Sequence, residues 1–276
     1  MKKLATIAAI ALLTLPALAQ DRKVYLDWAP KPDKMKDYAG ANKLITRLDD
    51  VLARHTGQAD WTEEVVQTER YDARWISMAP GTRTRTQFYG DDRTTWVVWG
   101  GQIRFTIKGQ EPFIATKGFL VQVPLRVPYS MEVVGNEPGL RFEVTRGGGI
   151  LPSYPVDSRA DFGSSPPPPR NGQHYVKVSY PSIPVGGGMG VPIPPATNKG
   201  HFHVQNDEFW FILEGKIAYE VEGKGLIVSK AGDVVLALPG RFHRAGWAPG
   251  QMDTRLAFNR SPTMQHNYAE DANGTQ

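Results

Sequence analysis

The sequence predicts an all-β protein built from two similar halves. Short runs rich in Val, Ile, Phe, Tyr and Trp, broken by Gly and Pro, dominate residues 74–144 and again residues 174–259, and such runs are typical of β-strands. Two segments with strict apolar alternation, 102–107 and 216–221, lie 114 positions apart. The same offset relates Trp96 to Trp210, Gly101 to Gly215, Gly118 to Gly232, and Tyr129 to His243. One offset across both halves indicates an internal duplication rather than chance recurrence.

The segment between the halves predicts their boundary. It runs from three glycines at 147–149 to four prolines at 166–169, which cannot form a central strand and favour an extended connector. We therefore expect a signal peptide at 1–19, a helical extension at 20–70, a first β-domain at 71–147, a linker at 148–173, a second β-domain at 174–262 and a tail at 263–276.

The extension contains a candidate helix at residues 34–55. Leu44, Leu48, Val51 and Leu52 fall on one face of that helix, which predicts an amphipathic helix packed against one of the β-domains. A helix that binds a partner is the alternative.

The amino terminus predicts export. Lys2 and Lys3 precede an apolar run from Leu4 to Leu15, and the small residues Ala17 and Ala19 follow, a pattern typical of a cleaved secretory signal. The run is shorter than the roughly 20 apolar residues that span a bilayer, and no other segment qualifies, so we expect no membrane span. The chain has no cysteine, which excludes disulfides and a lipid-modified cysteine. We expect a periplasmic or secreted protein.

The charge balance argues against nucleic acid as a partner. Of 32 basic side chains, two lie in the signal, and the remaining 30 nearly balance 28 acidic ones. No basic excess remains to attract phosphates.

The segment 200–208, GHFHVQNDE, carries the strongest chemical signal. His201 and His203 are two apart in a β-like stretch and therefore point to the same face. Glu208 follows five residues later, and a third histidine, His243, follows a second glycine- and proline-containing turn at 239–240. Three imidazoles and one carboxylate suit one divalent transition metal ion, which can be zinc, copper, manganese, iron or nickel.

These residues resemble the two motifs of the cupin superfamily, G-x5-H-x-H-x3,4-E-x6-G and G-x5-P-x-G-x2-H-x3-N. The first motif is matched by His201, His203, Glu208 and Gly215, and the second by Gly232, Gly240 and His243. The chain departs from the motifs at Pro195, Leu238 and Trp247. The resemblance implies two tandem cupin barrels (double-stranded β-helix, or jelly roll) with a short N-terminal helix, and a metal held by His201, His203, Glu208 and His243.

The first barrel lacks such a ligand set. Subtracting the offset from the four ligand positions gives Gln87, Tyr89, Thr94 and Tyr129, none of which is a strong ligand for a transition metal. The chain therefore resembles a bicupin with a degenerate, metal-free N-terminal barrel that serves as a scaffold. Alternatively, Gln87, Tyr89 and Tyr129, with Arg83 and Arg85, bind a small polar ligand without a metal.

Strand phase predicts the residues around the metal. Trp210 and Ile212 share the face of Glu208, Tyr219 lies on the inward face of the next strand, and the phase of His243 adds Arg241 and Trp247. We expect Tyr219 and Arg241 to be catalytic, and Trp210, Ile212, Arg241 and Trp247 to contact the substrate.

The resemblance implies a class of activity rather than one reaction. We expect a metal-dependent enzyme of dioxygenase, decarboxylase, lyase or isomerase type that acts on a small oxygenated or acidic molecule, as a monomer or homodimer. A non-catalytic periplasmic protein that binds a small molecule or a metal is the alternative. Since the signal lacks a twin arginine, the chain would acquire its metal outside the cytoplasm, where the affinity order favours copper, nickel or zinc.

The signal pattern predicts cleavage after Ala19. The exported protein should begin at Gln20, because Ala17 and Ala19 offer the small side chains that signal peptidase requires. The intact mass of the secreted form measures this directly, and a mature protein that retains Lys2 and Lys3 would contradict it.

Overall fold

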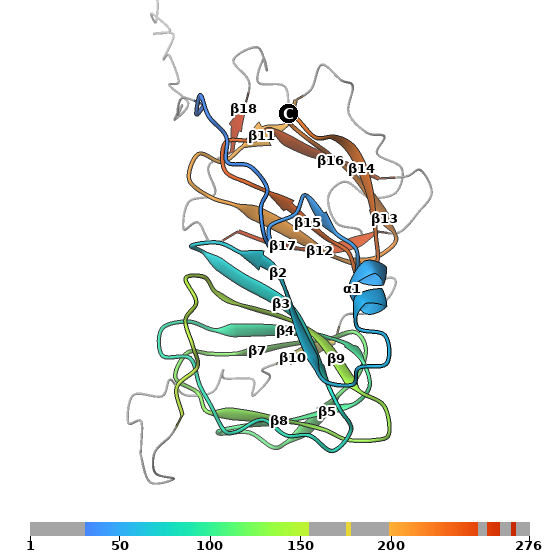
Figure 1. Cartoon of the computed structure of the whole chain (residues 1–276). Helices are drawn as coiled ribbons and strands as arrows, with labels where there is room; N and C mark the ends of the chain where they lie inside the picture. The colour runs from blue at the N-terminus through green and yellow to red at the C-terminus, as the bar shows by residue number, and fades with distance from the viewer. Residues whose placement is uncertain (1–30, 155–174, 178–198, 248–252, 260–265, 269–276) are drawn as a thin grey trace, which may run out of the picture.

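The computed structural model describes residues 31–154, 175–177, 199–247, 253–259 and 266–268. Within these ranges the chain forms 18 β-strands and a single helix, α1 (Leu48–Arg54) (Figure 1). This confirms the predicted all-β fold. Within the described residues, no helix is long and apolar enough to cross a membrane. The predicted signal peptide lies outside the described residues.

The N-terminal barrel consists of two antiparallel sheets. One has the strand order β10-β7-β4-β9-β3-β2 and the other the order β6-β5-β8. The strands are β2 (Trp61–Gln67), β3 (Tyr71–Met78), β4 (Thr94–Gly100), β5 (Ile103–Ile107), β6 (Phe113–Ala115), β7 (Phe119–Val123), β8 (Tyr129–Val133), β9 (Gly139–Arg146) and β10 (Tyr175–Lys177).

The C-terminal barrel also consists of two antiparallel sheets. Its sheets have the orders β1-β15-β12-β17 and β14-β13-β16-β11-β18. The strands are β1 (Ile45–Thr46), β11 (His201–Phe202), β12 (Glu208–Glu214), β13 (Lys216–Val221), β14 (Gly225–Lys230), β15 (Val234–Ala237), β16 (His243–Trp247), β17 (Thr254–Phe258) and β18 (Asn267–Tyr268).

The offset of 114 positions seen in the sequence also relates the strand pairings of the two barrels. In the N-terminal barrel Gln87 forms a bridge with Tyr129, and in the C-terminal barrel His201 pairs with His243. On the other sheet, Val98 of β4 lies opposite Arg141 of β9, just as Ile212 of β12 lies opposite Arg255 of β17. The central strands of the two barrels therefore share their register as well as their order: β7-β4-β9 corresponds to β15-β12-β17, and β6-β5-β8 corresponds to β14-β13-β16.

The two barrels pack against each other through the outer face of the six-stranded sheet of the N-terminal barrel and the outer face of the four-stranded sheet of the C-terminal barrel. Phe142 of β9 stacks on Phe211 of β12 with ring centroids 4.6 Å apart, and Trp75 of β3 lies 5.6 Å from Phe211. All three side chains are fully buried. Figure 1 shows the two barrels one above the other with these sheets adjacent. We call the buried side chains between the sheets the inter-barrel core.

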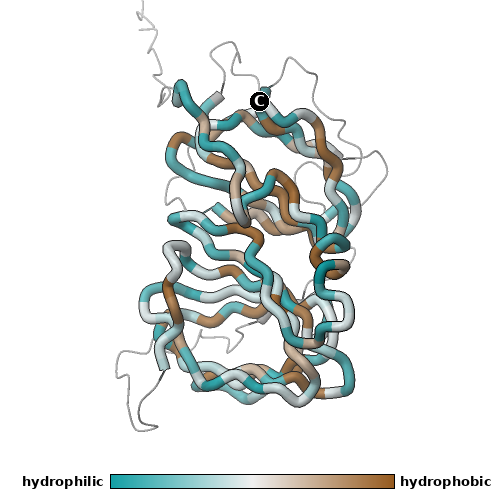
Figure 2. Tube along the Cα trace, in the orientation of Figure 1, coloured by the Kyte–Doolittle hydropathy of each residue, from teal (hydrophilic) through white to brown (hydrophobic). Residues whose placement is uncertain are grey.

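Each barrel also has an apolar interior of its own. Apolar residues centred on Trp96 and Phe105 fill the N-terminal barrel, and a smaller group around Trp210 and Tyr219 fills the C-terminal one. Figure 2 shows hydropathy changing from residue to residue within single strands. The alternation follows from the pleat of a strand, which sends successive side chains to opposite faces.

The helix is shorter than predicted. Residues 34–47 were expected to be helical, but Ile45–Thr46 forms β1 and pairs with β15, and the backbone at Arg47 is extended (φ −86°, ψ 129°). Pairing with the edge of the C-terminal sheet therefore overrides the local helical pattern. Leu48 and Val51 are buried as expected, whereas Leu52 is 41% exposed.

Helix α1 is held at the turn before β15. The carboxylate of Asp233 accepts a hydrogen bond from the backbone N–H of Leu48 at 3.3 Å and pairs with Arg47 at 2.9 Å. Gly232, which directly precedes Asp233, has φ +91°, and a Cβ there would come within 2.5 Å of the Leu48 side chain. Glycine is thus required for both the turn and the close approach of the helix.

Some elements lie outside the ranges in which the sequence analysis places them. The expected helical extension contains strands β1 and β2, and the expected tail contains β18. Strand β10 falls in the range assigned to the second barrel but pairs with β7 of the first. Short edge strands of this kind have little periodic signal, because partners distant in sequence determine their conformation. Most of the expected linker, from residue 155 on, lies outside the described residues.

The inter-barrel core predicts that the two barrels unfold together. Phe211→Ala should lower the free energy of unfolding by about 3 to 5 kcal/mol, because it leaves a cavity among aromatic rings from both barrels. Chemical denaturation followed by tryptophan fluorescence and circular dichroism measures this. Leu226→Ala, at a 54% exposed position, is the control and should change stability by less than about 0.5 kcal/mol. Two separate transitions in the parent protein would contradict the shared core.

Candidate metal centre

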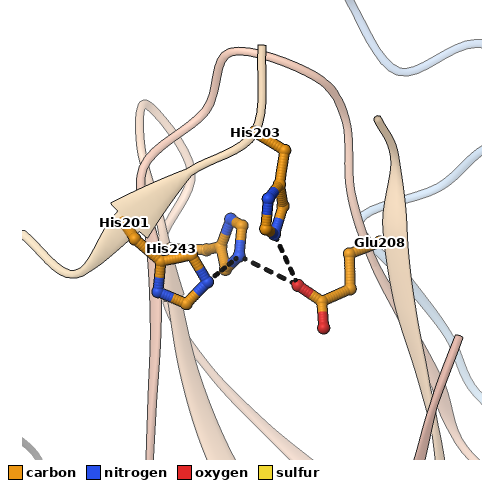
Figure 3. A group of neighbouring side chains, drawn as sticks. All are labelled: His201, His203, Glu208 and His243. Carbon is orange, nitrogen blue, oxygen red and sulfur yellow. Dashed lines mark hydrogen bonds and ion pairs between the residues drawn. The ribbon is translucent and has the colours of Figure 1, made fainter. Parts of the chain in front are cut away.

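Four side chains meet at one end of the C-terminal barrel. His201 lies on β11 directly opposite His243 on β16, His203 follows β11, and Glu208 begins β12. Figure 3 shows the three imidazoles and the carboxylate pointing toward one another. One potential ligand atom from each residue lies within 4.8 Å of those of the other three. The predicted ligand set is therefore brought together by the fold.

Close approach of β11 and β16 requires Gly200. This residue has φ +77°, and a Cβ there would lie 2.0 Å from the carbonyl oxygen of His243. Any other side chain would force the two strands apart. Glycine at this position therefore sets the separation between His201 and His243.

The donor atoms are close enough to share one cation. The Nε2 atom of His243 is 3.1 Å from Nε2 of His201 and 3.3 Å from Oε2 of Glu208. The Nε2 atom of His203 is 2.9 Å from the same oxygen of Glu208. All these side chains are buried except His201, which is partly buried.

The tautomer of His243 leaves a lone pair directed into the centre. Its Nδ1 lies 3.0 Å from the carbonyl oxygen of Arg241. A carbonyl can only accept, so Nδ1 carries the proton and Nε2 is unprotonated in the neutral ring. Hydrogen bonds of this type orient metal-ligating histidines in known sites. A divalent transition metal would satisfy the converging acceptors.

The electrostatics favour a neutral His201 and a charged Glu208. Burial, followed by the neighbouring His243, His266 and His203, lowers the pKa of His201 to about 2. Burial alone would raise the pKa of Glu208, but hydrogen bonds with His203 and His243 and their charges outweigh it and hold the pKa well below its usual range. Neutral imidazole and ionised carboxylate are the forms that bind a transition metal.

A fourth histidine, His266, lies beside the centre and was not predicted. Its ring centroid is 4.2 Å from that of His201 and 5.3 Å from that of His203. It directly precedes β18, which pairs with β11, and it is exposed. It falls in the expected tail and belongs to no motif. The one available signal was that the chain has only six histidines.

The barrel interior beneath the centre contains the predicted Trp210, Ile212 and Tyr219. Trp210 is 3% exposed, and its ring meets His243 edge-on at 5.3 Å between centroids. The Nε1 of Trp210 is buried and has no hydrogen-bond partner among the described residues. Ile212 and Tyr219 are fully buried. Strand phase therefore predicted their inward direction correctly, while the contact of Trp210 and Ile212 with substrate and the catalytic role of Tyr219 stay predictions.

Arg255 supplies a cation that sequence reasoning missed. From β17 its Nη1 donates a hydrogen bond of 2.9 Å to the hydroxyl of Tyr219, and its guanidinium lies 5.6 Å from the Trp210 ring centroid. Alternation along β17, together with the pairing of Arg255 opposite Ile212, would have placed it inside the barrel.

Arg241 does not face the metal centre, contrary to the prediction. Its guanidinium donates to the carbonyl oxygens of Lys36 at 2.7 Å and Glu222 at 3.0 Å, and it lies 3.6 Å from the carboxylate of Asp37. The prediction extended the alternation of β16 backwards, but the strand begins only at His243. Arg241 instead holds the N-terminal segment against the barrel.

Trp247 ends β16 opposite Ile217. Its side chain lies outside the described residues, so its predicted role in substrate binding stays a prediction.

The N-terminal barrel has no equivalent donor set. Gln87, Tyr89, Thr94 and Tyr129 occupy the positions that correspond to the ligands, and Nε2 of Gln87 donates to the hydroxyl of Tyr129 at 3.0 Å. Within the described residues, the group around His201 is the one cluster of histidine and acidic side chains that could hold a metal. The chain thus has two barrels of one design, and a metal-type donor set in the second.

This combination is similar to that of a bicupin. Residues 191–258, a range that contains strands β11 to β17, match the family model described as "Cupin domain". No curated protein sequence matches the chain.

Comparison with solved structures extends the likeness to both barrels. A Cupin 2 conserved barrel domain protein from Leptotrichia buccalis has a TM-score of 0.52 at 12% identity, covering 77% of this chain and 94% of that one. A variant of oxalate decarboxylase from B. subtilis has a TM-score of 0.48 at 15% identity, covering 83% and 78%. The protein Ylba from E. coli has a TM-score of 0.46 at 15% identity, covering 72% and 82%. At such identities the likeness concerns the fold.

The geometry predicts about one metal ion per chain, with the N-terminal barrel empty of metal. His203→Ala should lose most of the bound metal, since it removes one ligand, while the fold is retained because apolar burial supplies most of the stability. Elemental analysis of purified protein, paired with circular dichroism, measures both.

The matched control is His55→Ala, a histidine beside α1 that stacks on Trp61. It should keep the full metal content. Close to two ions per chain in the parent, or full occupancy in His203→Ala, would overturn the assignment.

Proposed function

We propose that the protein is a metal-dependent enzyme that acts on a small oxygenated or acidic organic molecule. The observation that carries the proposal is the convergence of three imidazoles and one carboxylate on a single point. A bound divalent metal would supply a Lewis acid that polarises a substrate oxygen. A metal ion that takes more than four ligands would still have free coordination positions for a substrate oxygen when these four residues bind it.

The surroundings of the centre support a small substrate with an acidic or oxygenated end. Trp210 offers an apolar wall next to His243. Arg255 brings a positive charge into the same barrel, over the Trp210 ring. A cation held in an apolar environment stabilises negative charge on a bound molecule far better than one in water.

Tyr219 fits a binding role better than that of a general base. Burial raises its pKa to about 12, although Arg255 partly opposes this. The phenol therefore keeps its proton at neutral pH, and it accepts a hydrogen bond from Arg255. We infer that Tyr219 positions Arg255 rather than removing a proton itself.

His266 is the polar side chain best placed to meet a substrate from the solvent side. It is exposed, and its ring packs against those of His201 and His203. We infer that it contacts the substrate without belonging to the four-residue ligand set.

We also propose that the protein functions outside the cytoplasm, in the periplasm or as a secreted protein. The charged start, short apolar run and small residues of positions 1–19 support this. In that setting the metal is bound after export, and its identity depends on the local supply.

Substitution of His266 tests the proposed activity. His266→Ala should keep its metal content but lower kcat/KM by roughly 10- to 100-fold, an effect expected for the loss of one hydrogen bond to a charged group of the reacting molecule. The assay follows product formation by NMR from a panel of monocarboxylic, dicarboxylic and α-keto acids, with the protein loaded separately with zinc, copper, nickel, manganese and iron. His55→Ala should retain the parent rate.

The same panel separates catalysis from binding alone. Tight association of one acid, measured by calorimetry and abolished in His203→Ala, without any product after prolonged incubation would contradict the enzyme proposal. It would favour a non-catalytic binding protein.

A further inference from the structure

The interior of the N-terminal barrel contains a buried arginine, Arg141. Its neighbour Phe142 on β9 points into the inter-barrel core, so Arg141 points the opposite way, into the barrel. Only 3% of its surface is exposed. Its Nε and Nη1 atoms are both buried and have no hydrogen-bond partner among the described residues.

Glu143, the acid whose charge acts on Arg141, does not pair with it. Oε1 of Glu143 accepts a hydrogen bond from Nε of Arg74 at 2.8 Å, and Oε2 accepts one from Nε1 of Trp96 at 2.6 Å. Both carboxylate oxygens are thus engaged elsewhere. An arginine does not give up its proton in a protein, so a charge is buried without a direct counter-ion, which is strongly unfavourable.

The C-terminal barrel shows what Arg141 lacks. Arg255 occupies the corresponding position, since both arginines lie opposite equivalent residues of the neighbouring strand. Arg255 donates to the hydroxyl of Tyr219, whereas the position corresponding to Tyr219 is Phe105, which has no hydroxyl. The two barrels share the arginine but not its partner.

In this barrel two phenols, Tyr89 and Tyr129, occupy the positions that correspond to His203 and His243 in the other barrel. Burial, followed by the charge of Glu143, raises the pKa values of Tyr89 and Tyr129 above their usual range. Both phenols therefore keep their protons. Tyr129 also acts electrostatically on Arg141.

We propose that the N-terminal barrel binds a small organic anion with a single carboxylate, without a metal, and that Arg141 is its charge partner. The carboxylate accepts from the unfilled guanidinium donors and replaces the missing counter-ion. Glu143 nearby disfavours a second negative charge on the ligand. The apolar surroundings of Trp96 and Phe105 favour a hydrocarbon body over a phosphate or sulfate.

The test uses the full mature chain with the C-terminal centre disabled by His203→Ala and His243→Ala, so that a carboxylate cannot bind there through a metal. Acetate, propionate and benzoate are titrated at constant ionic strength, with chloride as the comparison anion. Calorimetry and thermal unfolding should show saturable binding of at least one carboxylate and a Tm that rises with its concentration.

Arg141→Met in this background should abolish the carboxylate response. The Tm without ligand should stay equal or rise, because an apolar side chain of similar volume replaces an uncompensated buried charge. Arg255→Met is the matched control, since it removes the equivalent arginine of the other barrel, and it should keep the response.

Arg141→Lys keeps the charge but not the planar set of donors, and it should weaken the response at least tenfold. It serves as the second variant if Arg141→Met does not fold. The proposal is overturned if the parent shows no saturable response to any of the three carboxylates. It is equally overturned if Arg141→Met or Arg141→Lys responds as the parent does.

Discussion

The structure depends on the burial of both faces of the strands that lie between the two barrels. In β12, Phe209 and Phe211 point into the inter-barrel core, while Trp210 and Ile212 point into the C-terminal barrel. The strand therefore reads as an almost uninterrupted apolar run, as expected when neither face meets water. A polar residue within such a strand, such as Glu208 at its start, must have a partner or a function.

The same constraint explains why the two barrels differ chemically while sharing a register. The outer faces of β4, β9, β12 and β17 form one packed core and tolerate little change in volume. The inner faces are independent of each other. One interior could therefore hold a metal-type donor set beside Trp210, while the other holds Glu143, Arg74 and Arg141.

Sequence patterns predicted the fold class, the repeat and the four converging ligands, because each rests on a periodicity or a spacing. They failed where the conformation depends on distant partners. Residues 45–46 form a strand because β15 offers an edge, and Arg241 turns away because β16 starts two residues later. His266 reaches the centre through a two-residue strand, which is too short to show any alternation.

The pairing of β1 with β15 has a consequence for the order in which the chain folds. Ile45 of β1 and its partner Val235 are separated by 190 positions. The segment that carries β1 and α1 therefore cannot dock until β15 is in place, and such distant contacts form late and slowly. An unfolded chain stays open along this edge while the rest of the C-terminal barrel assembles, so the closing of the barrel by β1 is one of the last steps of folding.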